Sequence, residues 1–288
     1  MRLLVTGAAG QVGREIVRLA PGLGAEVAAL DRAALDVTDA QAVRQAVASS
    51  RADAVVNAAA YTAVDRAERE RALAFAVNRD GPRQLADACR QGDVPLVHLS
   101  TDYVFDGTKG APYEPGDPVS PANAYGESKA AGEGAVREAW GRHVIVRTAW
   151  VFSRYDGNFV STMWRLAAER DRLSVVADQW GHPTAAADVA RTAVAAARRA
   201  LDGASGTFHV AGSELATWRD LAAAAVAVGG APAVPVDPIA TSEYPTAAAR
   251  PARVELAMGD SLDRLGLAPL DWRASLEAEA RARFGAPG

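Results

Sequence analysis

A glycine-rich turn close to the start of the chain constrains the possible folds more than any other stretch. Residues 2–5 are apolar and predict a strand, and residues 12–19 have the apolar periodicity of an amphipathic helix. Between them the glycines follow the spacing G-x-x-G-x-x-G, which permits a tight turn, close approach of the backbone to a pyrophosphate and close packing of the next helix. The phosphates of a dinucleotide would lie at the N-terminus of that helix. The residues that this motif predicts to bind the cofactor are Gly7, Gly10, Gln11, Val12 and Gly13.

A second predicted strand, residues 25–30, ends in two opposite charges that would select the dinucleotide. Asp31 lies close to the roughly 20-residue offset at which a carboxylate binds the adenosine ribose, and its charge would repel a 2′-phosphate. The adjacent Arg32 offers that phosphate a planar, permanently charged partner. We therefore predict that both NADPH and NADH are used, with a preference within roughly tenfold, or about 1.4 kcal/mol. Asp36 and Val37 are expected on the adenine side, although this segment is also typical of a helix N-cap, and both can hold.

The first half of the sequence alternates strand and helix patterns, as is typical of an α/β fold with a doubly wound parallel Rossmann sheet. Beyond Thr148 the helices are joined by longer stretches that contain glycine and proline. We therefore predict a Rossmann domain from residues 1–150 plus 185–210, and a second, smaller α/β substrate domain from residues 151–184 plus 211–288. A chain of 288 residues with 49% hydrophobic composition has ample material for both cores. Strands are expected near residues 2–6, 25–30, 53–57, 94–99, 143–148 and 206–210.

Two hydroxyl residues and a tyrosine–lysine pair form the predicted catalytic centre. Ser100 and Thr101 follow a short apolar strand, and open parallel sheets bind their ligands at such carboxyl ends, so both hydroxyls are expected to face a crevice. Tyr125 and Lys129 are four residues apart near the start of a predicted helix over residues 123–140. That spacing places both side chains on one helical face.

This combination is suited to the reduction of a carbonyl group. A free tyrosine has a pKa of about 10, and the cation of Lys129 is expected to lower the pKa of Tyr125 toward the range of a general acid. The Thr101 hydroxyl can hold a carbonyl oxygen while the phenol protonates it, and a nicotinamide cofactor supplies the hydride. Taken alone, Tyr-x-x-x-Lys is also typical of two ordinary helix residues. The glycine-rich turn favours the catalytic interpretation.

These motifs, together with the run of three alanines after Asn57, resemble those of the extended short-chain dehydrogenases/reductases. Several segments are similar to the dTDP-4-dehydrorhamnose reductase family within that superfamily, and the similarity spans nearly the whole chain. The resemblance implies an NAD(P)H-dependent reductase of the C4 carbonyl of a dTDP-4-keto-6-deoxy sugar, with dTDP-L-rhamnose as the expected product. The similar segments are residues 57–68, 100–107, 147–152, 158–167, 178–184, 250–251 and 270–272.

The resemblance also implies individual roles. Asn78 matches an asparagine that shapes the active-site helix, although it could be merely a polar helix residue. Trp150 is a candidate for stacking on the sugar, with a buried core tryptophan as the alternative. Arg250 could pair with the diphosphate or be surface charge. Further residues expected at the cofactor are Ala58, Ala59, Ala60, Asn78, Ser100, Tyr125 and Lys129. Those expected at the substrate are Tyr61, Thr62, Val64, Asp102, Tyr103, Trp150, Asn158, Phe159 and Arg250.

Three other activities remain open at this point: reduction of a different dTDP-ketosugar, a redox-neutral epimerase or dehydratase of the same superfamily, and a non-catalytic regulatory subunit. Dehydratases of this kind carry glutamate after the Thr-Asp pair, whereas this chain has Tyr103. A non-catalytic relative would be expected to lose the catalytic pair, yet Tyr125 and Lys129 are present. Both observations favour a reductase.

Composition narrows the partners. A formal charge of −4 argues against general nucleic-acid binding, and no apolar run approaches the ~20 residues of a membrane span. The single cysteine, Cys89, cannot form an internal disulfide, and the four histidines lack metal-ligand spacing, so we expect a cytoplasmic enzyme without a histidine/cysteine metal site. Magnesium is possible but lacks a supporting cluster: Glu15 could match a glutamate that bridges a metal in dimeric relatives. The expected partner is a dTDP-sugar, and the expected state is a monomer or homodimer.

Overall fold

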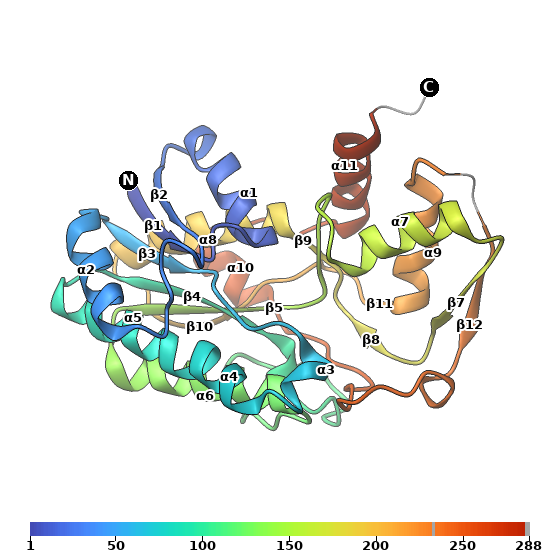
Figure 1. Cartoon of the computed structure of the whole chain (residues 1–288), viewed down its shortest axis with the longest axis horizontal. Coiled ribbons are helices and arrows are strands. Elements are labelled where there is room, and N and C mark those ends of the chain that lie inside the picture. Colours follow the sequence, from blue (N-terminus) through green and yellow to red (C-terminus); the bar gives the residue numbers. More distant parts are fainter. Residues whose placement is uncertain (232–233, 286–288) are drawn as a thin grey trace.

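The computed structural model of the chain describes residues 1–231 and 234–285. Residues 232–233 and 286–288, which fall within the predicted 211–288 segment, lie outside the described residues. The centre of the molecule is a six-stranded, all-parallel sheet with the order β10-β5-β4-β3-β1-β2, which confirms the predicted Rossmann class (Figure 1). Its strands are β1 (Arg2–Thr6), β2 (Glu26–Leu30), β3 (Ala54–Asn57), β4 (Leu96–Thr101), β5 (His143–Thr148) and β10 (Gly206–His209).

Helices cover both faces of this sheet because its strands carry apolar side chains on both sides. The helices on one face are α1 (Gln11–Leu19) and α8 (Ala186–Leu201). The helices on the other face are α2 (Ala40–Ser50), α5 (Gly81–Gln91) and α6 (Ala124–Ala139). Strands β2 and β3 lie on opposite sides of β1, so the winding direction reverses at β1 and β3. Ligands of doubly wound sheets bind at the carboxyl ends of the strands at this reversal.

A second, smaller core lies beside the sheet, on the right of Figure 1, and is built mainly by three helices. Pairs of short strands surround it: β6 with β9, β7 with β12, and β8 with β11. The helices are α7 (Phe159–Glu169), α9 (Trp218–Val228) and α11 (Trp272–Phe284). The strands are β6 (Val151–Phe152), β7 (Leu173–Val176), β8 (Trp180–Gly181), β9 (Thr184–Ala185), β11 (Ala216–Thr217) and β12 (Val236–Ile239).

Short helical segments complete the chain. Among them, α10 belongs to the predicted 211–288 segment, but its Leu262 and Leu265 pack into the core of the large sheet with α8. The segment 211–288 therefore contributes to both cores. The remaining segments are η1 (Pro21–Leu23), α3 (Val64–Ala67), α4 (Arg71–Phe75), the π-helical η2 (Ala76–Asp80), η3 (Asp102–Val104), η4 (Thr241–Glu243) and α10 (Gly259–Leu265).

A buried ion pair fastens α6 to the sheet below the catalytic centre. The guanidinium of Arg147 on β5 donates to both carboxylate oxygens of Glu133 on α6, at 2.8 and 2.7 Å, and lies 4.9 Å from the ring centroid of Phe105. The exposed fractions are only 2% for the Arg147 side chain and 0% for that of Glu133. Burial works to raise the pKa of Glu133, but the hydrogen bonds and charge of Arg147 outweigh it and hold the pKa below its ordinary value.

A second ion pair, between Arg154 and the buried Glu279, lies where the two cores meet. Arg154 donates to both oxygens of Glu279 on α11, at 2.9 and 2.8 Å, and lies 3.8 Å from Glu15 on α1. Glu15 also accepts from Arg18 and from the Tyr155 hydroxyl. Cationic and hydroxyl donors therefore surround Glu15, and no group of three or more potential metal ligands occurs in the described ranges.

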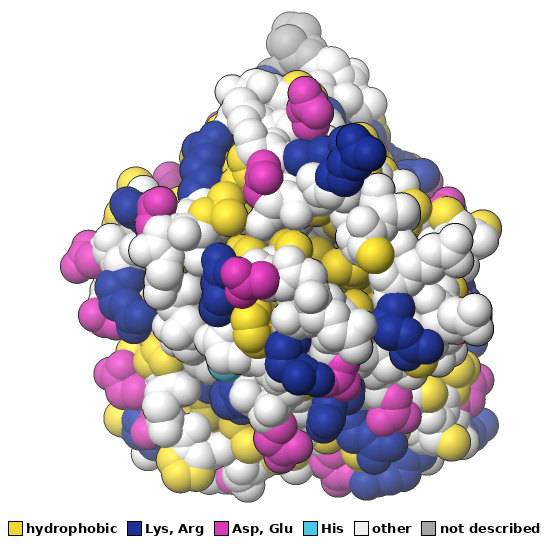
Figure 2. Space-filling view, turned by 90° about the vertical axis from the view of Figure 1, so that its left-hand side faces the viewer, with side chains coloured by type: hydrophobic (Ala, Val, Ile, Leu, Met, Phe, Trp, Pro, Cys, Tyr) yellow, Lys and Arg dark blue, Asp and Glu magenta, His cyan; other side chains and the backbone are white. Residues whose placement is uncertain are grey.

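No helix of residues 1–231 and 234–285 is both long enough and apolar enough to cross a bilayer. On the face in Figure 2, acidic and basic side chains are interspersed.

Candidate active site

A cleft of ≈ 450 Å³ opens at the carboxyl ends of β1 and β3, where the winding direction reverses. The glycine-rich turn forms one wall: Gly7 has a φ of +70°, and a Cβ built on it would lie 2.5 Å from the amide nitrogen of Ala59. A Cβ on Gly13 would lie 2.3 Å from the Gly7 carbonyl oxygen. Glycine is therefore required at both positions, as the motif predicted. The predicted residues that line the cleft are Gly7, Gly10, Arg32, Asp36, Val37, Ala58, Ala59, Ala60, Tyr61 and Thr62.

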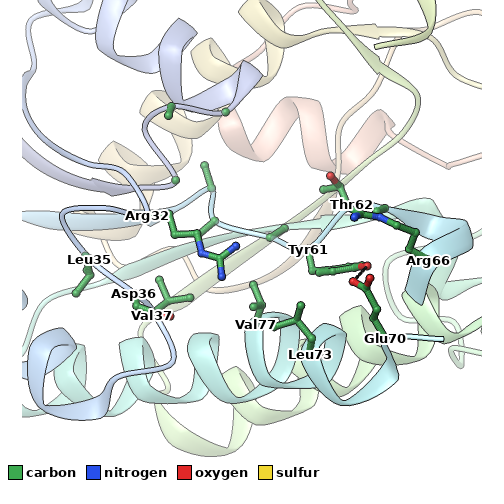
Figure 3. A pocket seen from close by; sticks show the side chains of 17 residues that line it. Arg32, Leu35, Asp36, Val37, Tyr61, Thr62, Arg66, Glu70, Leu73 and Val77 are labelled. Carbon is green, nitrogen blue, oxygen red and sulfur yellow. Dashed lines mark hydrogen bonds between the residues drawn. The ribbon is translucent and has the colours of Figure 1, made fainter. Parts of the chain in front are cut away.

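The end of β2 separates the two charges that the sequence placed side by side. The Arg32 side chain lines the cleft and projects into it (Figure 3). The Asp31 carboxylate instead accepts hydrogen bonds from the backbone amides of Ala33 and Ala34, at 3.0 and 2.9 Å. Asp31 thus holds the turn that presents Arg32, because a short carboxylate readily bonds amides two or three residues ahead.

Three further residues of the glycine-rich turn lie outside the cleft lining. Gln11 accepts a 2.6 Å hydrogen bond from the hydroxyl of Ser153, which ties the start of α1 to the chain after β6. Val12 packs against the core under the sheet, and Gly13 lies against the turn itself.

The far wall of the cleft contains the predicted Tyr61 and several residues that the sequence did not indicate, among them Glu70. Tyr61 donates a 2.6 Å hydrogen bond to Glu70, and Figure 3 shows the two side chains pointing toward one another. Since Tyr61 and Glu70 belong to no recognisable motif as a pair, only the folded chain reveals their contact. The other unpredicted lining residues are Ala9, Leu35, Ala63, Arg66, Leu73 and Val77.

Asn78 is fully buried and acts between elements. Its side-chain oxygen accepts from the Tyr61 amide at 2.8 Å, and its amide group donates to the Tyr61 carbonyl and to the Ser128 hydroxyl on α6, at 2.9 and 3.0 Å. Every contact is internal, so Asn78 fixes the Tyr61 loop to the helix that carries the tyrosine–lysine pair.

The predicted catalytic residues meet at the carboxyl end of β4. Helix α6 begins after the N-cap Asn123, so Tyr125 lies in its first turn, with its ring centroid 5.6 Å from that of Tyr103 in edge contact. Burial raises the pKa of Tyr125 to about 12, against the lowering effect of a hydrogen bond with Thr101. Thr101 in turn donates to Asp102 at 3.0 Å and accepts from the Tyr103 amide at 3.2 Å.

The expected effect of lysine on the tyrosine is wrong for this structure. The Lys129 ammonium donates at 2.7 Å to the carbonyl of Leu99, and its charge is not what sets the pKa of Tyr125. Burial lowers the pKa of Lys129 itself to about 8, although the charge of Glu133 works in the opposite direction. The physical reason is that a buried phenolate loses its hydration, and this penalty exceeds the help from its neighbours.

Ser100 also differs from its prediction. Its hydroxyl donates a 2.6 Å hydrogen bond to the buried Glu133 rather than facing the crevice. Successive side chains of a strand point to opposite faces, so Ser100 and Thr101 cannot both face one site. Ser100 therefore supports the ion pair below the catalytic centre.

The loop after β3 and the segment after η4 meet beside the tyrosines. Arg250 donates to Asp65 of α3 at 2.7 Å, and the Ala248 amide donates to the same carboxylate at 3.0 Å. Val64 packs with Tyr103 and Tyr125 in one small cluster. The Arg250 side chain is thus only 15% exposed, and its charge works to lower the pKa of the neighbouring Tyr103.

Trp150, which was predicted to stack on the sugar, belongs to an aromatic cluster between strands β6 and β8 and helices α7 and α9. Trp150 stacks on Trp218 with 3.7 Å between ring centroids, and Phe159 lies 4.6 Å from Trp218. One face of Trp150 is therefore covered by protein, which favours the core alternative for that face. Trp218 was missed because nothing in its surroundings in the sequence distinguishes it from a helix residue.

Asn158 is the N-cap of α7. Its side-chain oxygen accepts from the Ser161 amide at 3.1 Å, while its amide group donates to the carbonyls of Ser153 and Tyr155, at 3.0 and 2.6 Å. These contacts give Asn158 a structural role at the start of α7. The sequence analysis did not predict this role, although Asn is among the preferred N-cap residues.

Comparison with known proteins extends these observations to the whole chain. A family model described as RmlD substrate binding domain matches residues 1–283. The chain is 45% identical to a dTDP-4-dehydrorhamnose reductase from Streptomyces griseus, covering 100% of this chain and 95% of the relative. It is 43% identical to a dTDP-4-keto-6-deoxy-D-glucose reductase from Streptomyces niveus, covering 96% and 95%. A crystal structure of dTDP-4-dehydrorhamnose reductase from Bacillus anthracis in complex with NADP matches with a TM-score of 0.91 at 36% identity, covering 96% and 98%.

Proposed function

Since this chain belongs to the dTDP-4-dehydrorhamnose reductase family, we propose that it reduces the C4 carbonyl of a dTDP-4-keto-6-deoxy sugar with NADPH or NADH. The name shared by several of these relatives makes dTDP-4-dehydro-L-rhamnose the first substrate to test, with dTDP-L-rhamnose as product. The observation that carries the proposal is the meeting of Thr101, Tyr125 and Lys129 at the carboxyl end of β4, beside a cleft with the fit of a dinucleotide site.

The cleft residues fit the cofactor. Gly7 and Gly13 carry no side chains, so the backbone of the turn is accessible and a pyrophosphate can approach the N-terminus of α1. Arg32 would hold the adenosine end, and Ala58 to Ala60 would line the path toward the nicotinamide. When bound, the reduced nicotinamide supplies the hydride that the sugar carbon accepts.

The protein residues would then handle the oxygen of the sugar carbonyl. The raised pKa of Tyr125 keeps its phenol protonated at neutral pH, which is the form that a reduction needs, because the developing alkoxide must receive a proton. Thr101 would orient the oxygen. Lys129, anchored on the Leu99 carbonyl, would present its charge near the cofactor ribose.

The other substrate-facing groups belong to the same proposal. Arg250, held by Asp65, supports contact with the diphosphate, since its fork suits phosphate oxygens. Tyr61, Thr62, Val64 and Tyr103 would surround the sugar. Phe159 and the exposed side of the Trp150–Trp218 pair would contact the far end of the sugar.

A related substrate is the second candidate. The chain is almost as similar to the Streptomyces niveus protein named dTDP-4-keto-6-deoxy-D-glucose reductase as to the Streptomyces griseus protein. Parallel assays with the two ketosugars, each followed by the loss of reduced-nicotinamide absorbance, separate the two substrates by their kcat/KM values.

The reaction type has its own test. Because Tyr103 stands where a dehydratase needs a carboxylate, we expect one reduced cofactor to be consumed per ketosugar and no conversion of dTDP-glucose. The measurement is product analysis with and without added cofactor. A 4-keto-6-deoxy product formed from dTDP-glucose without a reductant would contradict the reductase assignment.

Cofactor preference is expected to depend on Arg32. Arg32 reaches the cleft while Asp31 is held by the turn, so the geometry moves our expectation from equal use toward a preference for NADPH. A charge-assisted hydrogen bond contributes about 1.5–3 kcal/mol before screening, and Arg32 is exposed, so Arg32→Ala should raise the KM for NADPH roughly tenfold. The KM for NADH should change less than about twofold, since a free 2′-hydroxyl offers no charge to Arg32.

The control for this prediction is Arg44→Ala, which removes an exposed arginine from α2 outside the cleft lining. That variant should leave both KM values unchanged. Equal effects of Arg32→Ala on both cofactors would mean that the side chain does not reach the 2′ position.

Location and assembly complete the proposal. Cys89 is the single cysteine of the chain and is buried as a free thiol, so no internal disulfide forms. We propose a cytoplasmic enzyme that works as a monomer or homodimer.

A further inference from the structure

Asp102 differs from every other buried carboxylate in the described residues. Glu15, Glu133, Asp188 and Glu279 are likewise buried, and each pairs with at least one arginine. Asp102 is 3% exposed and has no such partner within residues 1–231 and 234–285. Its hydrogen-bonding side-chain neighbour is the hydroxyl of Thr101, 3.0 Å away. A buried carboxylate without a cation is costly, so this arrangement needs a reason.

The hydrogen bonds of Thr101 limit what its hydroxyl can do. A hydroxyl has one proton and two acceptor positions. The Tyr103 amide occupies one acceptor position at 3.2 Å. If Asp102 is ionised, it can only accept, so it takes the single proton of Thr101. Thr101 then has no proton left to donate to a carbonyl oxygen of a substrate.

Protonation of Asp102 reverses this situation. A neutral carboxylic acid can donate its own proton to the Thr101 oxygen, and it fills the second acceptor position. The proton of Thr101 is then free to point toward Tyr125, which shares a hydrogen bond with Thr101, and toward the oxygen that Tyr125 protonates. The two forms of Asp102 therefore correspond to two orientations of one hydroxyl at the catalytic centre.

We propose that Asp102 is a positioning residue that works in its neutral form, as a hydrogen-bond donor that frees the Thr101 hydroxyl to hold the reacting oxygen. The inference rests on the proposed reduction and adds to it which protonation state is active. It assigns to Asp102 a role through Thr101, in place of the direct contact with substrate that the family resemblance implies.

The surroundings of Asp102 support a neutral acid near physiological pH. Burial raises its pKa to about 7, against the lowering effects of the Thr101 hydrogen bond and of the backbone amides of Asp102 and Tyr103. The charged and titratable groups around it are Tyr103 on its own turn, Tyr125 on α6, and the Asp65–Arg250 pair beside the tyrosines. The Lys129 ammonium donates to the Leu99 carbonyl, and the Arg250 guanidinium forms an ion pair with Asp65. Neither cation pairs with Asp102.

The decisive variant is Asp102→Asn, measured as kcat/KM for the ketosugar from pH 6 to 9 at saturating cofactor. The side-chain amide donates to Thr101 permanently, as the neutral acid does, and can no longer ionise. The wild-type value should fall about a hundredfold more between pH 6 and 9 than that of the variant, because a group with a pKa of about 7 is about 1% protonated at pH 9. At pH 6 the two enzymes should agree within about threefold. Any loss caused by Lys129, with its pKa of about 8, is common to both.

Three further measurements guard this interpretation. Asp106→Asn removes one charge four residues away, and its pH profile should be that of the wild type. Asp102→Asn in a Thr101→Val background should leave the pH profile unaltered, because the effect passes through the hydroxyl. Melting temperature and cofactor affinity of each variant establish that it is folded.

Two results would overturn the inference while leaving the reductase assignment intact. One is an active wild-type enzyme whose Asp102→Asn variant loses more than about tenfold at every pH, which would mean that the carboxylate form is needed. The other is a variant that retains the full wild-type loss at alkaline pH. A wild-type enzyme that consumes no cofactor with any ketosugar would instead contradict the proposed function itself.

Discussion

Replacing Tyr125 by phenylalanine should lower kcat by about 10²- to 10⁴-fold, the usual contribution of a positioned general acid. The change removes one oxygen atom and leaves the ring in its edge contact with Tyr103. The Thr101 hydroxyl and the Tyr103 phenol remain near the site, but the phenol that contacts Thr101 from the first turn of α6 is lost.

The measurement is steady-state turnover followed by cofactor absorbance, together with a direct titration of cofactor binding. Cofactor affinity should change little, because the phenol acts on the sugar oxygen. Tyr113→Phe is the matched control: its hydroxyl donates to Asp106 at 2.9 Å, in a cluster away from Tyr125, and its loss should leave kcat within about twofold. Near-normal turnover of Tyr125→Phe would falsify the assignment of the acid.

The largest effect on stability is expected from Arg147→Met. Within the described residues, this change leaves the buried Glu133 carboxylate with one ion-pair partner, the partly exposed Arg137, at 2.8 Å. Removing one member of a buried pair costs about 3–5 kcal/mol in the free energy of unfolding. For a chain of this size that corresponds to a fall in melting temperature of roughly 6–20 °C.

The sign of the pH dependence follows from the pKa of Glu133. Its pKa in the folded wild type is below the ordinary value, so the stabilisation by the pair is present at neutral pH and is lost as pH falls through that lowered pKa. In Arg147→Met the carboxyl can take up a proton at higher pH. The difference in stability between the two proteins should therefore shrink as the pH is lowered, from the pH at which the carboxyl of the variant takes up its proton down to the lowered pKa of the wild type.

Two variants separate the ion pair from general damage to the core. The double change Arg147→Met with Glu133→Leu should recover much of the loss, since apolar side chains of similar size can replace a buried pair. Arg165→Met removes an exposed partner of Glu169 and should cost less than about 1 kcal/mol. Thermal and denaturant unfolding measure all of these. An Arg147→Met protein as stable as Arg165→Met would show that the buried pair contributes little.

The sequence predicted those features that depend on local spacing. The strand, turn and helix at the N-terminus follow from the positions of Gly7 and Gly13, which the structure shows to be too crowded for a Cβ. The structure has the helix from Ala124 to Ala139 within the predicted range 123–140, and the four-residue spacing places Tyr125 and Lys129 on one helical face. Such rules need only the neighbouring residues.

The sequence failed where distant groups compete for one side chain. Ser100 faces Glu133 because consecutive strand residues alternate, a rule that was available, but its partner lies 33 residues away. The pKa of Tyr125 depends on burial, which motifs do not reveal, and Trp218 meets Trp150 only through the packing of α9. The turn contacts of Asp31, by contrast, are local and follow the known habit of short carboxylates.

Helix α10 is translated late, although its side chains complete the core of the large sheet. Leu262 and Leu265 fill the core beneath the sheet, and the Ser261 hydroxyl accepts from the His209 amide at the end of β10, at 2.9 Å. On the ribosome, all six strands leave the exit tunnel well before this helix does. A nascent chain that stops at residue 210 would expose the apolar side chains that Leu262 and Leu265 cover, so the core of the large sheet is complete only after α10 has been made.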